Sequence, residues 1–229
     1  MVRLENLGET ALMCDRVYDV LKREILKGSF KPGDTLNIVS LSRQLNVSNG
    51  PVREALNMLS RDGLVVLTPY KKATVAKGSE DEYKTVYDLR IFLEPYAAKD
   101  SADRIPEEEI TAMRGLLDAV LRDPEDRRLY LESDVKFHEM IYKHSESDLL
   151  VSVLDSVRTY TMRYYAEIME KLFAESGSPA DAIRETTLDH LRMLELAAAH
   201  DGEALAKALR EHIQHAYFQD AAQAAAGQD

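Results

Sequence analysis

Four side chains with metal-binding chemistry lie on the apolar stripes of segments that have helical periodicity. Asp134 and His138 are spaced i and i+4, which places both on one helix face, and that face is otherwise apolar. His190 and His212 lie on the apolar stripes of two later segments. Because a buried polar group is costly without a partner, we interpret these four side chains as the ligands of one metal ion.

The spacing of the two later histidines brings them level in a helical hairpin. The stretch His200-Asp201-Gly202 interrupts the helical pattern, and His190 and His212 lie eleven residues before and after Asp201. In an antiparallel hairpin that turns at Asp201, each imidazole lies about 16 Å from the turn, at about 1.5 Å per residue. The two rings therefore reach the same height.

Three imidazoles and one carboxylate suit a divalent transition metal, with Zn as the first choice and Ni, Co or Mn as the alternatives. The histidines must be deprotonated to bind it. The competing interpretation is that each histidine is a core residue bonded to a neighbouring carbonyl, and for a single histidine that situation is the more common one. The remaining histidines are interpreted as surface residues; they are His144, His200 and His215.

A metal with open coordination positions could bind a small organic carboxylate in place of water. Arg90 is the first candidate for binding a second carboxylate of this effector, because a guanidinium can hold a carboxylate through two hydrogen bonds. Arg158 and Arg163 are further candidates. The alternative for each arginine is a surface ion pair, which we favour for the two later ones. The partners would be Glu94, Asp155 and Glu167.

The chain of 229 residues is long enough for two modest domains, and its 45% hydrophobic content can fill their cores. No apolar run approaches the roughly 20 residues that a membrane span requires, and the start MVRLENLGET has no apolar signal core. The single Cys14 cannot form an internal disulfide, which agrees with a reducing compartment. We therefore expect a cytoplasmic protein without a membrane partner.

Positive charge is concentrated in the first third of the chain. Residues 11–78 contain eleven Lys or Arg and six Asp or Glu, whereas residues 79–229 contain seventeen and thirty-two. The net charges are therefore +5 and −15. A basic module joined to an acidic one is typical of a nucleic-acid reader attached to a sensor, because phosphate contacts need local positive charge.

The basic segment has the pattern of a helix-turn-helix followed by a wing. Apolar residues at helical spacing predict a first helix over 17–26 that ends at Gly28. Two short helices around a tight turn follow, and then two β-rich runs predict a hairpin with a basic tip. These helices cover 38–45 and the stretch from the cap at Ser48 or Asn49 to Asp62, and the strands cover 64–67 and 73–76.

The second helix of this motif can present its exposed face to a DNA major groove, where Arg suits guanine or phosphate and Asn suits adenine. The tip of the wing would touch phosphate or the minor groove. The candidate DNA contacts are Ser48, Asn49, Gly50, Arg53, Asn57, Arg43, Lys71 and Lys72. The alternative is a three-helix module with an ordinary hairpin and no nucleic acid.

From about residue 79 onward the pattern predicts only helices, and an antiparallel bundle of them would enclose the metal. The predicted helices cover 80–101, 106–122, 127–144, 147–175, 178–200 and 202–222. The fold class is therefore mainly α, with a winged helix-turn-helix domain at 10–78 that carries a small β-hairpin. An antiparallel α-helical bundle at 79–222 would bind metal and effector and would dimerise. We expect 223–229 to be a disordered tail.

The run LSRQLNVSNGPVREALNMLSRDGLVVL, with residues 12–78 around it, resembles the winged helix of GntR-type bacterial transcription regulators. Residues 80 to about 222 resemble the effector domain of the FadR subgroup in its metal-binding FCD branch. In that branch a D-x-x-x-H pair and two later histidines hold a metal, and they map onto Asp134, His138, His190 and His212.

Three positions depart from the pattern of the family. Asn49 stands where the family usually has Arg, and Gly50 stands where Thr is common. The turn at 70–73 lacks the Gly that is often found in the wing. Because a cationic groove contact is replaced, the operator sequence of relatives does not transfer to this chain.

The resemblance implies a homodimeric transcription regulator without enzyme activity, which we expect to repress at a palindromic operator in double-stranded DNA. A small organic carboxylate bound at the metal would change the affinity for that operator. The alternatives are a metal-dependent hydrolase and a dimerising adaptor without DNA contact. A hydrolase needs a general base near the metal. The H-E-x-x-H motif is absent, since Glu139 follows His138 but the next histidine is His144.

Overall fold

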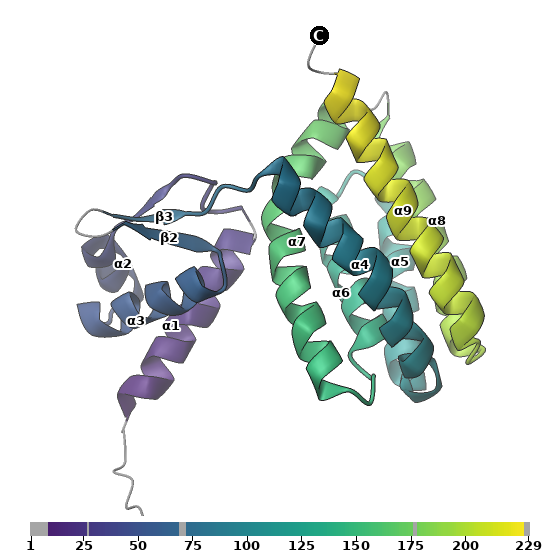
Figure 1. Ribbon diagram of the computed structural model, residues 1–229, viewed down its shortest axis with the longest axis horizontal. Coiled ribbons are helices and arrows are strands. Elements are labelled where there is room, and N and C mark those ends of the chain that lie inside the picture. The colour runs from purple at the N-terminus through teal and green to yellow at the C-terminus, as the bar shows by residue number, and fades with distance from the viewer. Residues whose placement is uncertain (1–8, 27, 69–71, 176–177, 227–229) are drawn as a thin grey trace, which may run out of the picture. The chain divides into compact units, whose positions relative to one another are not determined.

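The computed structural model describes residues 9–26, 28–68, 72–175 and 178–226, and Figure 1 shows the ribbon. The side chains of residues 9–12, 80, 163–175 and 216–226 lie outside that description. The contacts divide the chain into two units, one of residues 1–80 and 162–166 and one of residues 81–161 and 167–229. No helix among the described residues is long and apolar enough to cross a membrane.

The first unit packs three helices against a small sheet. In chain order its elements are α1 (Glu9–Leu26), β1 (Thr35–Leu36), α2 (Ile38–Leu45), α3 (Asn49–Arg61), β2 (Val65–Thr68) and β3 (Lys72–Val75). Its core is the apolar side of the predicted helices, for example Leu21 of α1 with Leu56 and Leu59 of α3, all 2% exposed or less. The prediction of a helix-turn-helix followed by a hairpin is therefore confirmed.

The sheet has one strand more than predicted. Strands β2 and β3 form the antiparallel hairpin, and β1 pairs with the other edge of β3, opposite Thr74 and Ala73. Strand β1 has two residues, too few to show an alternating pattern in the sequence. Tertiary pairing with β3 therefore defines this strand.

The turn between α2 and α3 is fixed by local chemistry. The Asn37 side chain accepts a hydrogen bond from the backbone N–H of Ser40 and so caps α2. Asn46 ends that helix at a φ of 53°, in the left-handed region that Asn adopts more readily than most residues. These two residues set where α2 ends and where α3 can begin.

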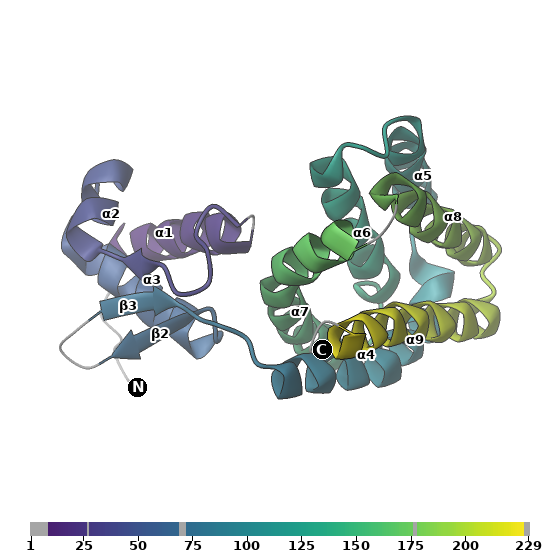
Figure 2. The same ribbon diagram turned by 90° about the horizontal axis from the view of Figure 1, so that it is seen from above.

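The second unit is entirely helical in its described residues. It contains α4 (Glu80–Ser101), a short 3-10 turn η1 (Ala102–Arg104), α5 (Glu107–Arg122), α6 (Arg127–Tyr142), α7 (Asp148–Glu175), α8 (Pro179–Ala198) and α9 (Gly202–Ala226). Figure 2 shows these helices arranged around a common core, with α9 running along α4. Helix α9 continues through 223–226, which the sequence analysis assigned to a disordered tail, while 227–229 lie outside the described residues.

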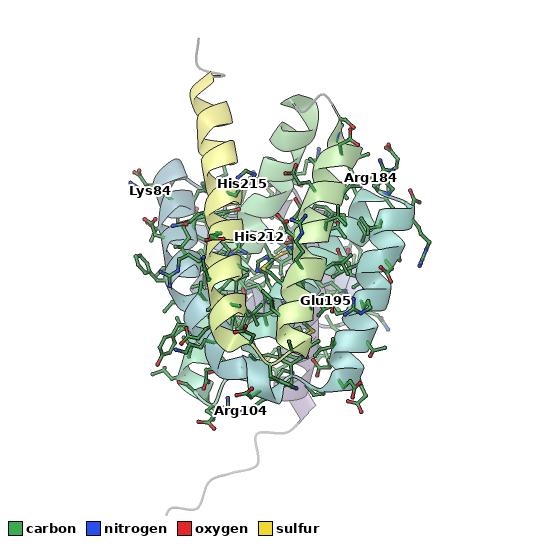
Figure 3. All side chains as sticks on the ribbon, turned by 90° about the vertical axis from the view of Figure 1, so that its right-hand side faces the viewer. Lys84, Arg104, Arg184, Glu195, His212 and His215 are labelled. Carbon is green, nitrogen blue, oxygen red and sulfur yellow. The ribbon has the colours of Figure 1, made fainter. Side chains whose placement is uncertain are left out.

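Helices α8 and α9 form the predicted hairpin (Figure 3), and its turn lies at 199–201. His200 adopts a φ of 56° there, and Asp201 caps α9 by accepting a hydrogen bond from the backbone N–H of Ala204. Leu194 of α8 and Leu209 of α9 are fully buried in the core of the bundle. The hairpin therefore joins the apolar stripes of two helices that follow one another in the chain.

Gly202 allows α9 to begin directly against α4. A Cβ at this position would lie 2.6 Å from the carbonyl oxygen of Lys99 and 3.2 Å from its Cα. We expect Gly202→Ala to lower the free energy of unfolding by about 1–3 kcal/mol in denaturant titrations, because the backbone of α4 must move. Gly115→Ala is the matched control, since nothing lies within 4 Å of its Cβ and it lies inside α5, and it should be neutral or stabilising. Equal stability of the two variants would contradict this close approach.

Candidate metal centre and DNA-reading surface

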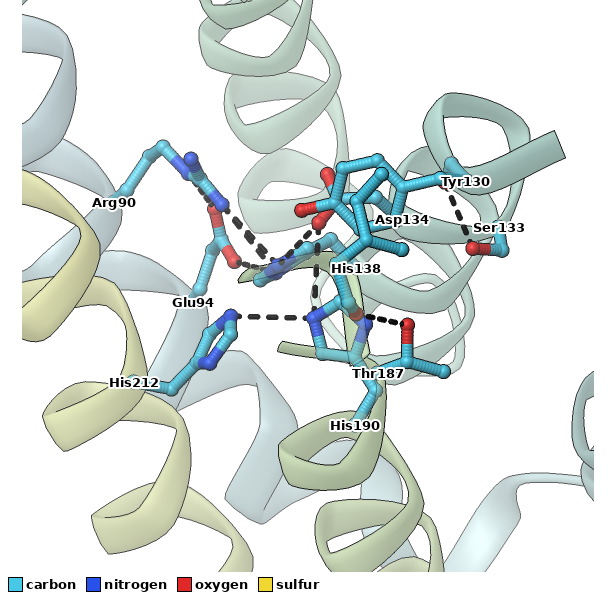
Figure 4. A network of polar contacts seen from close by, with 10 residues as sticks. Arg90, Glu94, Tyr130, Ser133, Asp134, His138, Thr187, His190 and His212 are labelled. Carbon is cyan, nitrogen blue, oxygen red and sulfur yellow. Dashed lines mark hydrogen bonds and ion pairs between the residues drawn. The ribbon is translucent and has the colours of Figure 1, made fainter. Parts of the chain in front are cut away.

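Three imidazoles from three helices meet inside the second unit. His138 of α6, His190 of α8 and His212 of α9 each offer a ring nitrogen, and these nitrogens lie within 4.8 Å of one another (Figure 4). The Nε2 atoms of His190 and His212 are 3.2 Å apart, so the α8–α9 hairpin brings these two rings level. The equal spacing of His190 and His212 from Asp201 thus brings their rings to the same height in the hairpin, as predicted.

Asp134 adds a carboxylate to this cluster. It is buried one turn before His138 on α6, and its Oδ1 atom lies 3.7 Å from Nε2 of His190 and 4.0 Å from Nε2 of His138. These distances are too long for strong hydrogen bonds, yet they place the carboxylate beside two of the three nitrogens. The structure therefore brings the four predicted ligands to one place.

Aromatic packing fixes the orientation of the innermost ring. His190 is 0% exposed and stacks on Phe137, with ring centroids 4.2 Å apart and an interplanar angle of 21°. The ring of His138 meets His190 edge-on at 5.4 Å. Because Phe137 precedes His138 on α6, the same turn of this helix supplies one candidate ligand ring and the surface on which another packs.

Burial keeps two of the imidazoles neutral. Removal from water, followed by the neighbouring His212 and His138, lowers the pKa of His190 well below its ordinary value. Burial also lowers the pKa of His212 to about 3, and the neighbouring His138 and Arg90 act in the same direction. Neutral imidazole is the form that binds a metal, so these two rings are ready to donate at physiological pH.

The donor set fits a divalent transition metal. Nδ1 of His190 is buried and has no hydrogen-bond partner among the described residues, so a bond from this nitrogen to a neighbouring carbonyl does not explain the burial of the ring. Its other nitrogen faces His212 and Asp134. Three convergent imidazoles with one carboxylate are a common ligand set for Zn and its neighbours, and the residues present therefore fit such an ion.

Arg90 and Glu94 of α4 complete the polar centre, as Figure 4 shows. Nε of Arg90 donates to Oε1 of Glu94 at 2.5 Å, and Oε2 of Glu94 lies 2.7 Å from Nδ1 of His138. Burial alone would raise the pKa of Glu94, but the charge of Arg90 and the contact with His138 outweigh it and lower that pKa to about 2. The predicted alternative for Arg90, a surface pair with Glu94, is correct in its partner and wrong in its location, because both side chains are buried.

Most of the predicted DNA contacts lie on the exposed side of the helix-turn-helix. Arg53 projects from the second turn of α3, and its neighbours Val52 and Leu56 are buried. Asn57 is half-buried, whereas the remaining described candidates are exposed: Arg43, Ser48, Asn49, Gly50 and Lys72. Lys71 lies outside the described residues. The amphipathic pattern of α3 thus leaves its first two turns open on one side.

Asn49, which replaces the usual arginine, is held by a contact between the two helices of the motif. Its Oδ1 position lies 2.6 Å from the buried Ser42 hydroxyl of α2, and that hydroxyl also lies 2.7 Å from the carbonyl of Ile38. A hydroxyl donates only once. If Ser42 donates to the carbonyl, the Asn49 amide must turn its NH2 group toward Ser42 and present its oxygen outward. Ser48 occupies the cap position of α3, but its side chain makes no capping bond.

Both units match known protein families. Residues 14–75 match the family described as bacterial regulatory proteins, gntR family, and residues 85–215 match the FCD domain family. The chain is a GntR-family transcriptional regulator with an FCD domain. The gntR match covers α1 to β3 and the FCD match covers the helices from α4 to α9, so this regulator carries its helix-turn-helix before its helical domain.

Relatives cover nearly the whole length of this GntR-family regulator. It is 28% identical over 203 residues to an uncharacterized HTH-type transcriptional regulator, YdhC, of Bacillus subtilis (strain 168), with 86% of each chain covered. It is 24% identical over 211 residues to the HTH-type transcriptional repressor RspR of Escherichia coli (strain K12), covering 91% of this chain and 89% of the relative. The structure of E. coli McbR/YncC has the same fold, with a TM-score of 0.78 at 23% identity over 92% of this chain and 98% of that one.

Arg158, another candidate arginine of the regulator, forms ion pairs away from the candidate metal ligands. Nη1 of Arg158 pairs with Glu139 at 2.6 Å, and Asp155 lies 4.0 Å from its Nη2. The side chain of Arg163 lies outside the described residues. Arg158 therefore adopts the ion-paired arrangement that the sequence analysis favoured for it, with Glu139 as the closer partner.

The remaining histidines of the regulator lie away from the metal cluster. His200 and His215 are exposed, and His200 Nδ1 lies 3.1 Å from the carbonyl oxygen of Ala102. His144 is half-buried and pairs with Glu109 at 3.1 Å. The prediction of surface positions is thus correct for the two residues of the hairpin, whereas His144 is tied to α5. Figure 3 shows His212 and His215 at successive levels of α9.

Proposed function

We propose that this regulator is a homodimer that binds a palindromic operator in double-stranded DNA and represses transcription from it. A metal centre of Asp134, His138, His190 and His212 binds a small organic carboxylate, and that binding changes the operator affinity. The observation that carries the proposal is the meeting of three imidazoles from three helices in the core of the FCD domain. Such a regulator acts on the chromosome, so we expect it in the cytoplasm.

We expect the ion to be Zn, with Ni, Co or Mn as the alternatives. The ion would act as a Lewis acid that binds a carboxylate oxygen of the effector. Arg90 is the preferred anion-binding side chain of the pocket. Its Nη2 atom lies 3.4 and 3.5 Å from the two ring nitrogens of His138, which puts the guanidinium beside the cluster. Arg158 and Arg163 are secondary candidates, and the pairing of Arg158 with Glu139 counts against it.

The DNA-reading role belongs to the exposed side of α3 and to the wing. Arg53 and Asn49 contact base edges or phosphate in the major groove, supported by Ser48, Gly50, Asn57 and Arg43. Lys71 and Lys72 contact phosphate from the wing. The net charge of +5 on residues 11–78, within a chain of net charge −11, supports this assignment, because phosphate binding depends on local positive charge.

A hydrolase is disfavoured by the carboxylates near the cluster. Metal-assisted hydrolysis needs a general base that can take a proton from water. Glu139 pairs with Arg158, and Glu94 is held by both Arg90 and His138. Neither carboxylate is therefore free to act as that base. The effector instead binds and leaves unchanged, and its affinity is linked reciprocally to that of the operator.

An exposed apolar patch on α4 and α7 supports the homodimer. Phe92 and Tyr96 share one face of α4 and are 67% and 69% exposed, and Leu149 on α7 is 76% exposed. The two helices are neighbours, because Leu93 of α4 and Leu150 of α7 pack against the same buried cluster. Large exposed apolar side chains on neighbouring helices are typical of a protein interface, and a second copy is the occupant that a palindromic operator requires.

We expect Phe92→Glu to convert the dimer to a monomer, because the charge would be buried against a second copy. Light scattering coupled to size-exclusion chromatography measures the mass directly. Leu188→Glu, at an exposed apolar position of α8, is the control that should leave the dimer intact. A wild-type monomer, or a dimer in both variants, would remove the patch from the interface.

The sensing function is tested by DNA binding in the presence of candidate effectors. Labelled DNA from upstream of the coding region is titrated with zinc-loaded protein and with protein treated with a chelator, each with and without a panel of small mono-, di- and tricarboxylic acids. The expected result is that one class of acid shifts the dissociation constant for DNA at least fivefold in the zinc-loaded protein only. A shift of the same size after chelation would contradict a role for the metal.

A further inference from the structure

Glu94 contacts both a candidate metal ligand, His138, and the candidate effector-binding residue, Arg90. The sequence did not predict Glu94 itself as a metal-binding or effector-binding residue. It lies on α4, and His138 lies on α6, so the contact links two helices. Its Oε2 atom lies 2.7 Å from Nδ1 of His138, and its Oε1 atom accepts from Nε of Arg90 at 2.5 Å. All three side chains are less than 9% exposed. Water therefore does not compete for these contacts.

The contact with Glu94 determines which nitrogen of His138 carries the proton. An ionised carboxylate can only accept hydrogen bonds, so the neutral imidazole must donate through Nδ1–H. Nε2 then carries the lone pair, and Nε2 is the atom that faces Asp134. A ring nitrogen needs a lone pair to bind a metal, and a carboxylate on the opposite nitrogen is a common way to orient a metal-binding histidine.

The other buried imidazole lacks this support. Nδ1 of His190 has no hydrogen-bond partner among the described residues, its Nε2 atom lies 3.2 Å from Nε2 of His212, and its ring stacks on Phe137. Packing restrains a ring plane, and a neutral imidazole such as His212 can either donate or accept, so neither contact selects one tautomer of His190. Within the described part of the cluster, Glu94 is thus the carboxylate that can select a tautomer of a metal-binding histidine.

We infer that Glu94 is a positioning residue that holds His138 as the Nδ1-protonated tautomer, aims its Nε2 atom at the metal, and couples this ligand to Arg90. The inference rests on the proposed metal centre and deepens it. Since one carboxylate holds both partners, a displacement of Arg90 by an effector anion acts on His138 through Glu94. The effector therefore alters the affinity for the metal, and the metal alters the affinity for the effector by the same factor.

Glu94→Gln tests this role with the smallest change in shape. The amide oxygen can accept from His138 or from Arg90, but the NH2 group then faces the other donor, so one contact is lost. The expected result is a 10–100-fold increase in the dissociation constant for Zn²⁺, measured by competition with a chromophoric chelator. Glu139→Gln is the matched control, because it also breaks a carboxylate–arginine pair of α6 but should leave the affinity for zinc unchanged.

A second readout separates positioning from general damage. In metal-free protein labelled with ¹⁵N-histidine, the ring of His138 should show the Nδ1–H tautomer in the wild type, and Glu94→Gln should reduce its population. If loss of the carboxylate beside Arg90 unfolds the domain, the double variant Arg90→Met/Glu94→Gln removes the unpaired buried charge and should show the same two changes. A merely structural role would leave the tautomer where it was.

The outcomes distinguish failure of the proposed metal centre from failure of the role inferred for Glu94. Wild-type protein that binds no zinc would overturn the metal centre and this inference with it. Wild-type protein that binds zinc, with Glu94→Gln equal to it in affinity and in tautomer, would overturn the inference alone. Weaker zinc binding in Glu94→Gln with an unchanged tautomer would also overturn it, because the effect would then not act through His138.

Discussion

Replacing His190 or His212 with alanine is expected to abolish stoichiometric zinc binding, with an increase of more than about 100-fold in the dissociation constant. The loss of a direct ligand should exceed the 10–100-fold effect that changes around a ligand already produce. Wild-type protein at a free zinc concentration 100-fold above its dissociation constant gains about 2.7 kcal/mol of stability. For a chain of this size that gain raises the melting temperature by about 5–11 °C. Both alanine variants should lose this increase.

His215→Ala is the matched control for this prediction, since His215 is exposed one turn beyond His212 on α9. It should bind zinc and gain thermal stability as the wild type does. Metal content measured by mass spectrometry, together with melting curves with and without chelator, shows whether His190 and His212 are zinc ligands. Undiminished metal content in both His190→Ala and His212→Ala would refute the assignment of the site, whatever the melting temperatures are.

Arg53→Ala is expected to weaken operator binding by about 1–3 kcal/mol, which corresponds to about 5–150-fold in the dissociation constant. Arg53 is exposed on α3 while its neighbours on that helix form the core, so its removal should not disturb the fold. If the side chain contacts phosphate, the loss of affinity should be similar for all DNA sequences. The slope of the logarithm of the binding constant against the logarithm of salt concentration should then decrease in magnitude by about one. If it contacts a base, specificity at one position should relax.

The control for Arg53 is Arg122→Ala, an exposed arginine at the end of α5 in the FCD domain. It removes the same charge from the chain without touching the helix-turn-helix. Fluorescence anisotropy at several salt concentrations measures affinity and salt slope together, and zinc content should be normal in both variants. An equal loss of affinity in the two variants would show that net charge, rather than the surface of α3, governs binding.

Local pattern was sufficient for the boundaries of most elements. Helix α2 covers the predicted residues 38–45, because Asn37 and Asn46 cap it with interactions that lie within a few residues. The bundle helices follow their apolar stripes in the same way. Strand β1 could not be predicted, because a two-residue strand shows no alternating pattern. Residues 223–226 were predicted to be disordered but continue α9, because alanine favours a helix even without an apolar stripe.

The four candidate metal ligands could be predicted from the sequence because each is linked to local geometry. Asp134 and His138 are one helical turn apart, and a count of residues around Asp201 places His190 and His212 level in a hairpin. The contact between His138 and Glu94 could not be predicted from the sequence. Glu94 is separated from it by 44 residues, and its spacing of four from Arg90 indicated only an ordinary ion pair.

The amino-acid sequence by itself determined the two-part organisation, the helix-turn-helix and the residues able to bind a metal, because periodicity, capping and composition are properties of short segments. The tertiary structure decided that α4 borders the candidate metal centre, that the pair of Arg90 and Glu94 is buried, and that one carboxylate contacts both His138 and Arg90. The physical reason is that burial depends on which helix faces pack together. Spacing along one helix predicts neighbours on that helix, whereas contacts between helices depend on the packing of the whole bundle.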